Sequence, residues 1–505
     1  MCGDGERASV TNFIAMPPPG AEYRFDRDAG PGTPASAGDK RFELRMRWLY
    51  NRCKTRDTTD PPQAATTLSS GLLYLAQLVA HDMIETAPGR EAWRVGRDEA
   101  RAANCRCAVL ELETLYGSGM DPRRFRAGRF VLGQARVASG CPMRDVPREG
   151  RAALVADGRN DDHAIIAQLA ALFMRVHNVL ADALPAYISD DERIRRARAA
   201  LTLLYRGVVR RELLPHLLAP HVASAYLVPA PSYLDPDGAA GVPVEFSHAA
   251  FRFGHVMPRF RYRFNGGADS AHPLHDSLRF TSARRQDFAG GAFLDESWLV
   301  DWRLFLDGPG QRAVNRSHAL APADQAAFHV AAQFTDEVPA DPPPLLLRDL
   351  LACGIARPWS VPALIARIAA QPQGAALLAP WHVNGQWADA LRCWLAPHGT
   401  GADADAVVAD PPLVFFVAFE AAEELVDGTR RGGATLGTLG SIIVAEVLCR
   451  ALERGPLAIG FGADPRARIA ALDPALAGIA ARLPTCPGLL DLAQLAGLVP
   501  QAGNP

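Results

Sequence analysis

The sequence predicts a mainly α-helical protein. Three long stretches place apolar residues at helical spacing, namely residues 69–84, residues 165–180 and residues 201–218. Apolar residues make up 49% and charged residues 21% of the 505-residue chain, so a large core can form and global disorder is not expected. By length, two or three domains or one large core would fit.

Charge and cysteine usage disfavour several classes of function. A net charge of −2 gives no electrostatic footprint for nucleic acid. Only Lys40 and Lys54 are lysines, which is typical of a GC-rich bacterial genome and disfavours Schiff-base and phosphate-loop chemistry. The nine cysteines follow no disulfide framework. No leader and no run of about 18 apolar residues is found, so we expect a cytoplasmic protein without a membrane span.

The N-terminal region differs in composition from the rest of the chain. Residues 1–62 are rich in glycine, proline and charged side chains and carry no motif. We expect an irregular N-terminal arm over residues 1–62 and a folded domain over residues 63–505.

The helix predicted over residues 69–84 carries polar side chains on one of its faces. Gln77 and His81 are four residues apart, so both point to the same side of the helix. Asp82 is one residue further on and points elsewhere. We therefore expect Gln77 and His81 to face one site together.

A polar stretch, residues 157–163, precedes the second long helix. It contains Arg159, Asp162 and His163. Within the helix that follows, His177 shares a face with apolar side chains, which favours a structural role in the core.

Residues 245–258 are expected to form one helix that ends at a proline. Arg252 and His255 are three residues apart on one face, and Gly254 leaves the backbone beside the histidine bare. An axial haem ligand needs a neutral imidazole on a rigid element, next to bare backbone and near a cation. His248, two turns earlier, is a competing candidate.

The pattern Ser-x-Ala-Ala-Phe-Arg-Phe-Gly-His that ends at His255 resembles the proximal-histidine helix of the animal haem peroxidases. The order Gln-x-x-x-His-Asp at residues 77–82 resembles the distal helix of this family, and residues 157–163 resemble its catalytic-arginine segment. The likeness runs in the same order over roughly residues 65–498. It implies a single large helical haem peroxidase domain, with the haem between a distal and a proximal helix.

The resemblance also implies roles for individual residues. His81 would be the acid/base that acts on hydrogen peroxide, and Arg159 would stabilise the negative charge on the departing oxygen. Gln77 would face the peroxide beside His81. On the proximal side, His255 would bind the iron of haem b, and Arg252 would lie at a haem propionate.

Asp349 stands where the family holds an asparagine against the proximal histidine. A carboxylate there would draw the imidazole proton more strongly than an amide does and would make the ligand more electron-donating. The alternative is that Asp349 turns away and forms an ordinary helix-surface ion pair with a nearby arginine.

Two further features of the family are altered in this chain. Asp162 stands at a carboxylate position that can be esterified to haem, whereas Ala80 and His163 replace the residues that form the other links, so one ester or none is expected.

Residues 107–118 end in Tyr-Gly-Ser and resemble the family's calcium loop. Asp82, Glu111 and Glu113 would be the calcium ligands, and Cys107 stands at a threonine position. A modified calcium site and two ordinary surface glutamates both stay open.

We predict a haem peroxidase that uses hydrogen peroxide to oxidise a small, electron-rich organic substrate, as in a biosynthetic tailoring step. One alternative is a haem dioxygenase similar to cyclooxygenases or fatty-acid α-dioxygenases, although Arg252 stands at the position of the cyclooxygenase tyrosine. Another is a non-catalytic haem-binding protein, which the presence of both His81 and Arg159 disfavours. The sequence identifies neither the organic substrate nor the oligomeric state.

Overall fold

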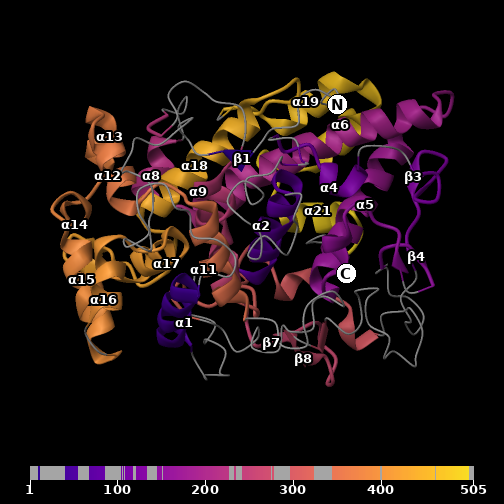
Figure 1. Ribbon diagram of the computed structural model, residues 1–505. Coiled ribbons are helices and arrows are strands. Elements are labelled where there is room, and N and C mark those ends of the chain that lie inside the picture. The colour runs from indigo at the N-terminus through magenta and orange to yellow at the C-terminus, as the bar shows by residue number, and fades with distance from the viewer. Residues whose placement is uncertain are drawn as a thin grey trace.

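The computed structural model describes residues 10–11, 40–54, 68–85, 104, 106, 109–117, 121–133, 145–150, 152–226, 232–234, 242–274, 276–277, 296–323, 344–398, 401–460 and 462–499. These residues are mainly helical and share one cluster of buried apolar side chains, which confirms the predicted fold class. Helices α12 to α16 gather at one end of the molecule, and short hairpins lie at the other end (Figure 1).

The helices and strands have the following bounds. The α-helices are α1 (Lys40–Cys53), α2 (Ser70–Met83), α4 (Glu113–Tyr116), α5 (Ala164–Ala183), α6 (Asp190–Val208), α7 (Leu214–Leu217), α8 (Pro220–Ala225), α9 (Val244–Ser247), α11 (Leu345–Ala356), α12 (Val361–Ala369), α13 (Pro372–Leu377), α14 (Pro380–Val383), α15 (Gln386–Leu395), α16 (Ala402–Ala409), α17 (Leu413–Glu423), α18 (Thr438–Glu453), α19 (Pro465–Leu472), α20 (Ala477–Arg482) and α21 (Leu489–Leu495). The 3₁₀ segments are η2 (Gly158–Asp161), η4 (Ala250–Val256), η5 (Glu296–Trp298), η6 (Trp302–Leu304), η9 (Ala396–His398) and η10 (Pro474–Leu476), and η3 (Val209–Leu213) is a π-helical turn. The strands form two-stranded sheets: β1 (Val10–Thr11) with β6 (Val242–Pro243) in parallel, and, antiparallel, β2 (Phe125–Arg126) with β3 (Arg129–Phe130), β4 (Arg148–Glu149) with β5 (Ala152–Ala153), β7 (Arg261–Arg263) with β8 (Ala271–Pro273), and β9 (Leu425–Val426) with β10 (Thr429–Arg430).

The three long helices occur where the sequence predicts them. α2 and α5 match their predicted ranges closely, whereas α6 begins at Asp190, before the predicted start. The side chain of Ser189 caps α6 by accepting a hydrogen bond from the backbone N–H of Glu192. α6 then continues through η3 into α7.

α5 lies in the core and packs against α2, α6 and α21. By length and composition alone, this helix could cross a membrane, but 83% of its apolar window is buried inside the fold. Burial in the core therefore accounts for its apolar composition.

The expectation of an irregular arm over residues 1–62 does not hold for α1. This helix packs against α11, and a Cβ added at Gly354 of α11 would lie 2.5 Å from the ring of Phe42. The close approach of the two helices needs that glycine. Apart from residues 10–11 and 54, the rest of the arm lies outside the described residues.

The prediction of one helix over residues 245–258 is wrong. The short helix α9 ends, and the 3₁₀ segment η4 begins after Ala249, which has φ −137° and ψ −85°. The backbone carbonyl of Ser247, which a continuing α-helix would use, instead accepts a hydrogen bond from Arg252 Nε at 3.1 Å. Because a 3₁₀ helix has about three residues per turn, Arg252 and His255 still share a face.

Candidate functional site

The structure brings the predicted distal and proximal segments together. α2 packs against α4, α5, η2 and η4, so it meets both the arginine segment and the segment that carries His255. Leu73, Gln77 and His81 follow one another at intervals of four residues on one face of α2. A Cβ added at Gly254 would lie 3.5 Å from Leu73, so this face of α2 turns toward the residue next to His255.

The hydrogen bonds of His81 determine which of its nitrogens carries the proton. His81 Nδ1 lies 2.9 Å from Asn160 Oδ1, and Asn160 Nδ2 donates to the carbonyl oxygen of Thr114 at 3.0 Å. A carbonyl only accepts, so the amide orientation is fixed and Asn160 Oδ1 must accept from His81 Nδ1–H. His81 Nε2 therefore holds the lone pair that a general base needs.

Arg159 is held beside the backbone of His81. Its Nη2 lies 3.0 Å from the carbonyl oxygen of His81 and 2.7 Å from Asp157 Oδ2, and its Nη1 donates to the carbonyl oxygen of Ile84 at 2.8 Å. Burial opposes the charge of Arg159, but the hydrogen bonds and charge of Asp157 outweigh burial and raise the pKa of the guanidinium. Arg159 is thus a fixed cation next to the base.

Gln77 is oriented by His163, a role that the sequence does not suggest. His163 Nδ1 accepts from the backbone N–H of Ile166 at 3.3 Å, so Nε2 carries the proton and donates it to Gln77 Oε1 at 3.1 Å. Burial first, and then the charge of His81, lowers the pKa of His163 to about 3. Because neutral His163 donates to Oε1 of Gln77, the amide of Gln77 can still donate through its own N–H groups.

On the proximal side, Asp349 bridges His255 and Arg252. Its Oδ2 accepts from His255 Nδ1 at 2.6 Å, and its Oδ1 accepts from Arg252 Nη1 at 2.5 Å. Burial raises the pKa of Asp349, but the charges of His255 and Arg252 outweigh burial and bring it down to about 2. Asp349 therefore partners His255 as expected, and the alternative, in which Asp349 turns away to a surface ion pair, is wrong, because the buried carboxylate contacts Arg252 and His255 together.

The same hydrogen bond assigns the proximal tautomer. With the proton on Nδ1, His255 Nε2 is the nitrogen that can coordinate a metal. The imidazole is 38% exposed, whereas Asp349 beneath it is 1% exposed. An imidazole with a buried carboxylate behind it fits an axial ligand of haem iron. The competing His248 is buried with its Nδ1 2.9 Å from Ser247 Oγ, which favours a role in the core.

Two other polar residues lie near the distal segment. Asp162 is half-buried directly after η2, and its charge acts on Arg159. His177 is buried, with Tyr116 Oη 2.7 Å from its Nδ1 and the carbonyl oxygen of Gly128 3.1 Å from its Nε2. These contacts agree with the structural role expected for His177.

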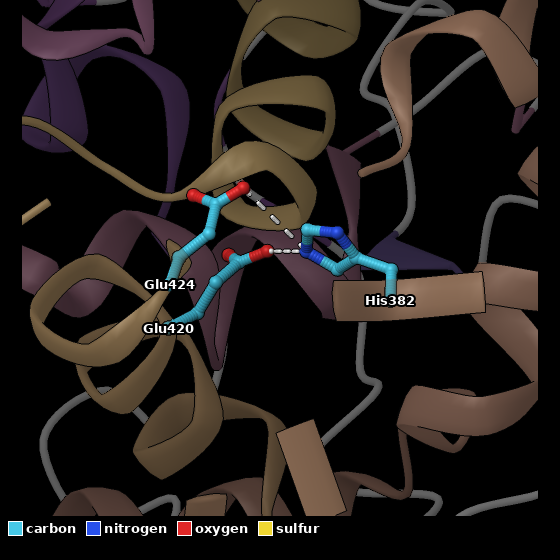
Figure 2. Close-up of side chains that lie close together, drawn as sticks. All are labelled: His382, Glu420 and Glu424. Carbon is cyan, nitrogen blue, oxygen red and sulfur yellow. Dashed lines mark hydrogen bonds and ion pairs between the residues drawn. The ribbon is translucent and has the colours of Figure 1, made fainter. Parts of the chain in front are cut away.

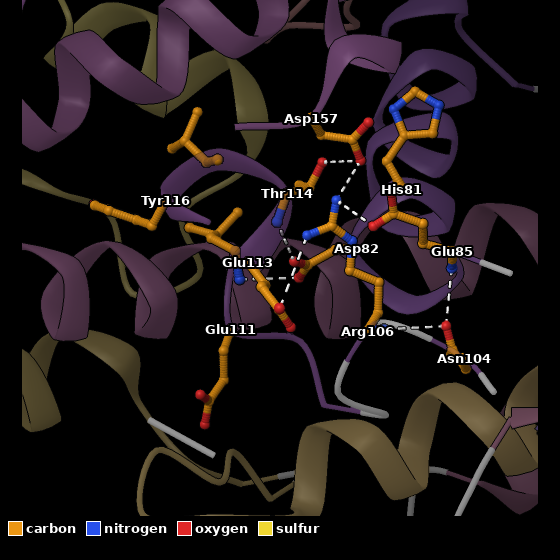
Figure 3. A network of polar contacts seen from close by, with 12 residues as sticks. His81, Asp82, Glu85, Asn104, Arg106, Glu111, Glu113, Thr114, Tyr116 and Asp157 are labelled. Atoms are coloured by element: carbon orange, nitrogen blue, oxygen red, sulfur yellow. Dashed lines mark hydrogen bonds and ion pairs between the residues drawn. The ribbon is translucent and has the colours of Figure 1, made fainter. Parts of the chain in front are cut away.

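Asp82 does not offer its oxygens to a cation. Its Oδ2 accepts from the backbone N–H of Leu112 at 2.9 Å and its Oδ1 from that of Thr114 at 3.1 Å (Figure 3). Burial raises the pKa of Asp82 to about 6, although both N–H donors lower it. Leu112 has a φ of 57°, so the carboxylate holds a strained backbone.

The two glutamates of the expected calcium site face guanidinium groups. Glu111 Oε1 lies 3.8 Å from Arg206 Nη2, and Glu113 Oε1 lies 3.9 Å from Arg106 Nη1. Calcium takes about six to eight oxygen ligands and tolerates no cationic neighbour in that shell. The described residues therefore do not fit the expected calcium site, and Cys107 lies outside them.

A second buried polar cluster, which the sequence analysis missed, joins α14 and α17 (Figure 2). His382 Nε2 lies 2.7 Å from Glu420 Oε1 and 3.8 Å from Glu424 Oε1. The two carboxylates also accept backbone N–H groups at the start of α18: Glu420 from Leu439 and Gly440, and Glu424 from Thr438. The cluster therefore fixes the start of α18 against α17.

Comparisons with known proteins point to one family. Residues 112–358 match the family model described as animal haem peroxidase. The chain is 30% identical to human thyroid peroxidase over 196 residues and 34% identical to mouse thyroid peroxidase over 187 residues. These matches cover 37% and 36% of this chain and 19% of each relative, so the chain aligns with only about a fifth of those proteins.

Solved structures match over nearly the whole chain. Peroxidase A from Dictyostelium discoideum gives a TM-score of 0.59 at 13% identity, covering 96% of this chain and 92% of its own. Fatty acid alpha-dioxygenase from Oryza sativa gives 0.58 at 13% identity, covering 97% and 86%. At these identities the matches show a shared fold.

Proposed function

We propose that the chain, of which residues 112–358 match the animal haem peroxidase family model, is a haem peroxidase that oxidises a small, electron-rich organic substrate with hydrogen peroxide. The observation that carries the proposal is the pair of matched histidine tautomers. In both histidines Nδ1 carries the proton, which leaves Nε2 of His81 to act as a base and Nε2 of His255 to bind a metal, and the segments that carry them, α2 and η4, pack against each other. A binding protein without turnover would need only the second.

Each polar group near this region has a defined task in the proposed reaction. His81 Nε2 takes a proton from hydrogen peroxide and returns it to the departing oxygen. Arg159 stabilises the negative charge that grows on that oxygen, because Asp157 and two backbone carbonyls hold the guanidinium in place. Gln77 donates its amide N–H groups beside His81. His255 Nε2 would hold the haem iron, and the bound haem would supply the electrons that reduce peroxide and recover them from the organic substrate.

Arg252 supports peroxidase over dioxygenase chemistry. At this position, where the family resemblance places the cyclooxygenase tyrosine, the Arg252 side chain is hydrogen-bonded to Asp349 and to the carbonyl oxygen of Ser247. An arginine cannot form the phenoxyl radical that hydrogen abstraction would require. Fatty-acid dioxygenation is the second candidate, because a fatty-acid dioxygenase shares the fold.

One experiment separates these functions. The purified protein, reconstituted with haem b, is mixed with hydrogen peroxide and a phenol in one assay and with a saturated fatty acid and oxygen in another. We expect a peroxide-dependent change of the haem spectrum and phenol oxidation. Oxygen uptake with the fatty acid and no phenol oxidation would establish the dioxygenase instead, and haem binding without either reaction would contradict both.

The proximal geometry further supports a weak oxidant that is poor with chloride. The carboxylate of Asp349 draws the Nδ1 proton of His255, so the imidazole donates more electron density to iron. With Ala80 and His163 at two link positions, at most one ester, through Asp162, would withdraw density. Mass spectrometry after acid–acetone extraction would count the links, and two links would contradict this proposal.

A further inference from the structure

Arg106 lies at the junction of the three segments that build the distal side. Its guanidinium Nη2 is 2.8 Å from Asp157 Oδ2 and 2.9 Å from Glu85 Oε2, and its Nη1 is 3.9 Å from Glu113 Oε1 (Figure 3). Asp157 directly precedes η2, Glu85 lies two residues after the end of α2, and Glu113 begins α4. The Arg106 side chain is only 6% exposed. One fixed positive charge therefore holds the three segments together.

The backbone next to Arg106 is also anchored to α2. Asn104 Nδ2 donates to the carbonyl oxygen of Met83 at 2.7 Å, and Asn104 Oδ1 accepts from the backbone N–H of Glu85 at 2.8 Å and of Arg106 at 3.2 Å. The asparagine thus satisfies groups left open at the end of α2. It also sets the position from which the arginine side chain enters the buried cluster.

Asp157 connects this cation to the proposed catalytic residues. Its Oδ2 accepts from Arg106, from Arg159 and, at 3.2 Å, from the hydroxyl of Thr114. Thr114 in turn accepts from Asn160 through both its hydroxyl and its carbonyl oxygen at 3.0 Å, and Asn160 holds His81. The contacts that fix the guanidinium of Arg159 and the tautomer of His81 therefore meet at Asp157.

We propose that Arg106 is a built-in cation that takes the place of the expected calcium ion and positions both Arg159 and His81 through Asp157. The charges agree with this assignment, because the carboxylates around Arg106 already face arginines or backbone N–H groups. A planar guanidinium bridges two carboxylates with separate N–H groups, which a spherical ion would do only by gathering their oxygens around itself. Arg106 is a positioning residue, since it touches Asp157 and not the reacting atoms.

The proposal predicts a protein whose distal side is indifferent to calcium. In the haem-loaded protein as purified, metal analysis should find calcium well below one ion per chain, and neither a calcium chelator nor added calcium should move the thermal unfolding midpoint. This test needs no activity, so it stands even if the proposed peroxidase function fails. Stoichiometric calcium whose removal lowers the midpoint would overturn the proposal.

Substitution tests the positioning role, which rests on the proposed function. Arg106→Met keeps the length of the side chain and removes its charge, and we expect the reaction with peroxide to slow by about 10- to 100-fold, the usual effect of losing a residue that orients a catalytic group. The Michaelis constant for the organic substrate should not change. Arg106→Lys should recover part of the rate, because lysine restores the positive charge but not the planar guanidinium with its several N–H groups.

The matched control is Arg123→Met, which removes an exposed arginine with its own carboxylate partners, Asp121 and Glu149. It should leave the rate and the unfolding midpoint unchanged. If Arg106→Met reacts with peroxide as fast as the control, Arg106 does not position the distal residues. If Arg106→Met does not fold, the rate of Arg106→Lys decides. A rate equal to that of wild type would mean that any buried cation suffices, and it would overturn the positioning role of the guanidinium.

Discussion

The distal and proximal histidines have the same protonation pattern but opposite partners. Both carry the proton on Nδ1 and keep Nε2 for chemistry. His81 donates to the neutral amide of Asn160, whereas His255 donates to the ionised carboxylate of Asp349. A neutral acceptor stabilises the charged form of the ring less than a carboxylate does, which suits the proposed role of His81 in gaining and releasing a proton. A carboxylate partner makes an imidazole a stronger donor to a metal, which suits the proposed role of His255 as the haem ligand.

The largest effect is expected when the distal histidine is removed. His81→Ala should slow the reaction with hydrogen peroxide by about 10²–10⁴-fold, because the general base is lost. The haem spectrum before peroxide should keep its proximal signature, whereas His255→Ala should lose it. Stopped-flow absorbance with both variants measures the two effects. A rate for His81→Ala within a factor of about three of wild type would remove His81 from the reaction, because it lies far below the range for acid–base catalysis.

The next largest effect is expected when His255 is given an amide partner like that of His81. Asp349→Asn replaces the carboxylate by an amide, so the iron of the bound haem should become poorer in electrons and the ferric/ferrous potential should rise. Haem affinity or peroxide turnover should change by about 10- to 100-fold, the usual range for a partner of a metal-bound histidine. Redox titration measures the potential.

A control for Asp349→Asn is available in a surface ion pair. Asp301→Asn removes the partner of Arg303, with which Asp301 makes a 2.6 Å contact at a site where the arginine is 49% exposed. This variant should leave the potential where it is. An Asp349→Asn potential equal to that of the control would show that the carboxylate does not tune the proximal histidine.

The smallest expected effect is a difference in the pH at which groups on the two sides lose their contribution to stability. Burial lowers the pKa of His163 from 6.5 to about 3 and that of His177 to about 4, so the unfolded chain binds more protons than the folded one below pH 6.5. The stability that these two histidines contribute should therefore fall as the pH falls from 6.5 toward 4. Asp349, with its pKa lowered from 3.8 to about 2, should contribute a loss only below about pH 4.

Urea unfolding between pH 7 and pH 3 measures this order of events. His163→Gln keeps an amide donor for Gln77 and removes the titrating ring, so its loss of stability between pH 6.5 and pH 4 should be smaller by roughly 1–3 kcal/mol, since one pKa unit corresponds to about 1.4 kcal/mol. An acid response of the variant that matches wild type would mean that His163 is not held neutral in the fold.

Local sequence pattern determined the features of this protein that depend on one helix at a time. The apolar spacing of α2 and α5 marked both helices, and the interval of four residues placed Gln77 and His81 on one face. These predictions hold because the geometry of a regular helix depends only on its own residues. The segment around His255 departs from the pattern, because α9 ends at Ser247 and a 3₁₀ segment begins at Ala250.

Only the tertiary structure decided which partners tune these side chains. Asn160 lies 79 residues from His81, and Asp349 lies 94 residues from His255. The sequence suggested the second pairing only through a family resemblance, and it pointed to neither Asn160 nor Arg106. A pattern of spacing reports which face a residue occupies, whereas the charge, tautomer and pKa of a buried group depend on atoms that distant segments bring within about 3 Å, the length of a hydrogen bond.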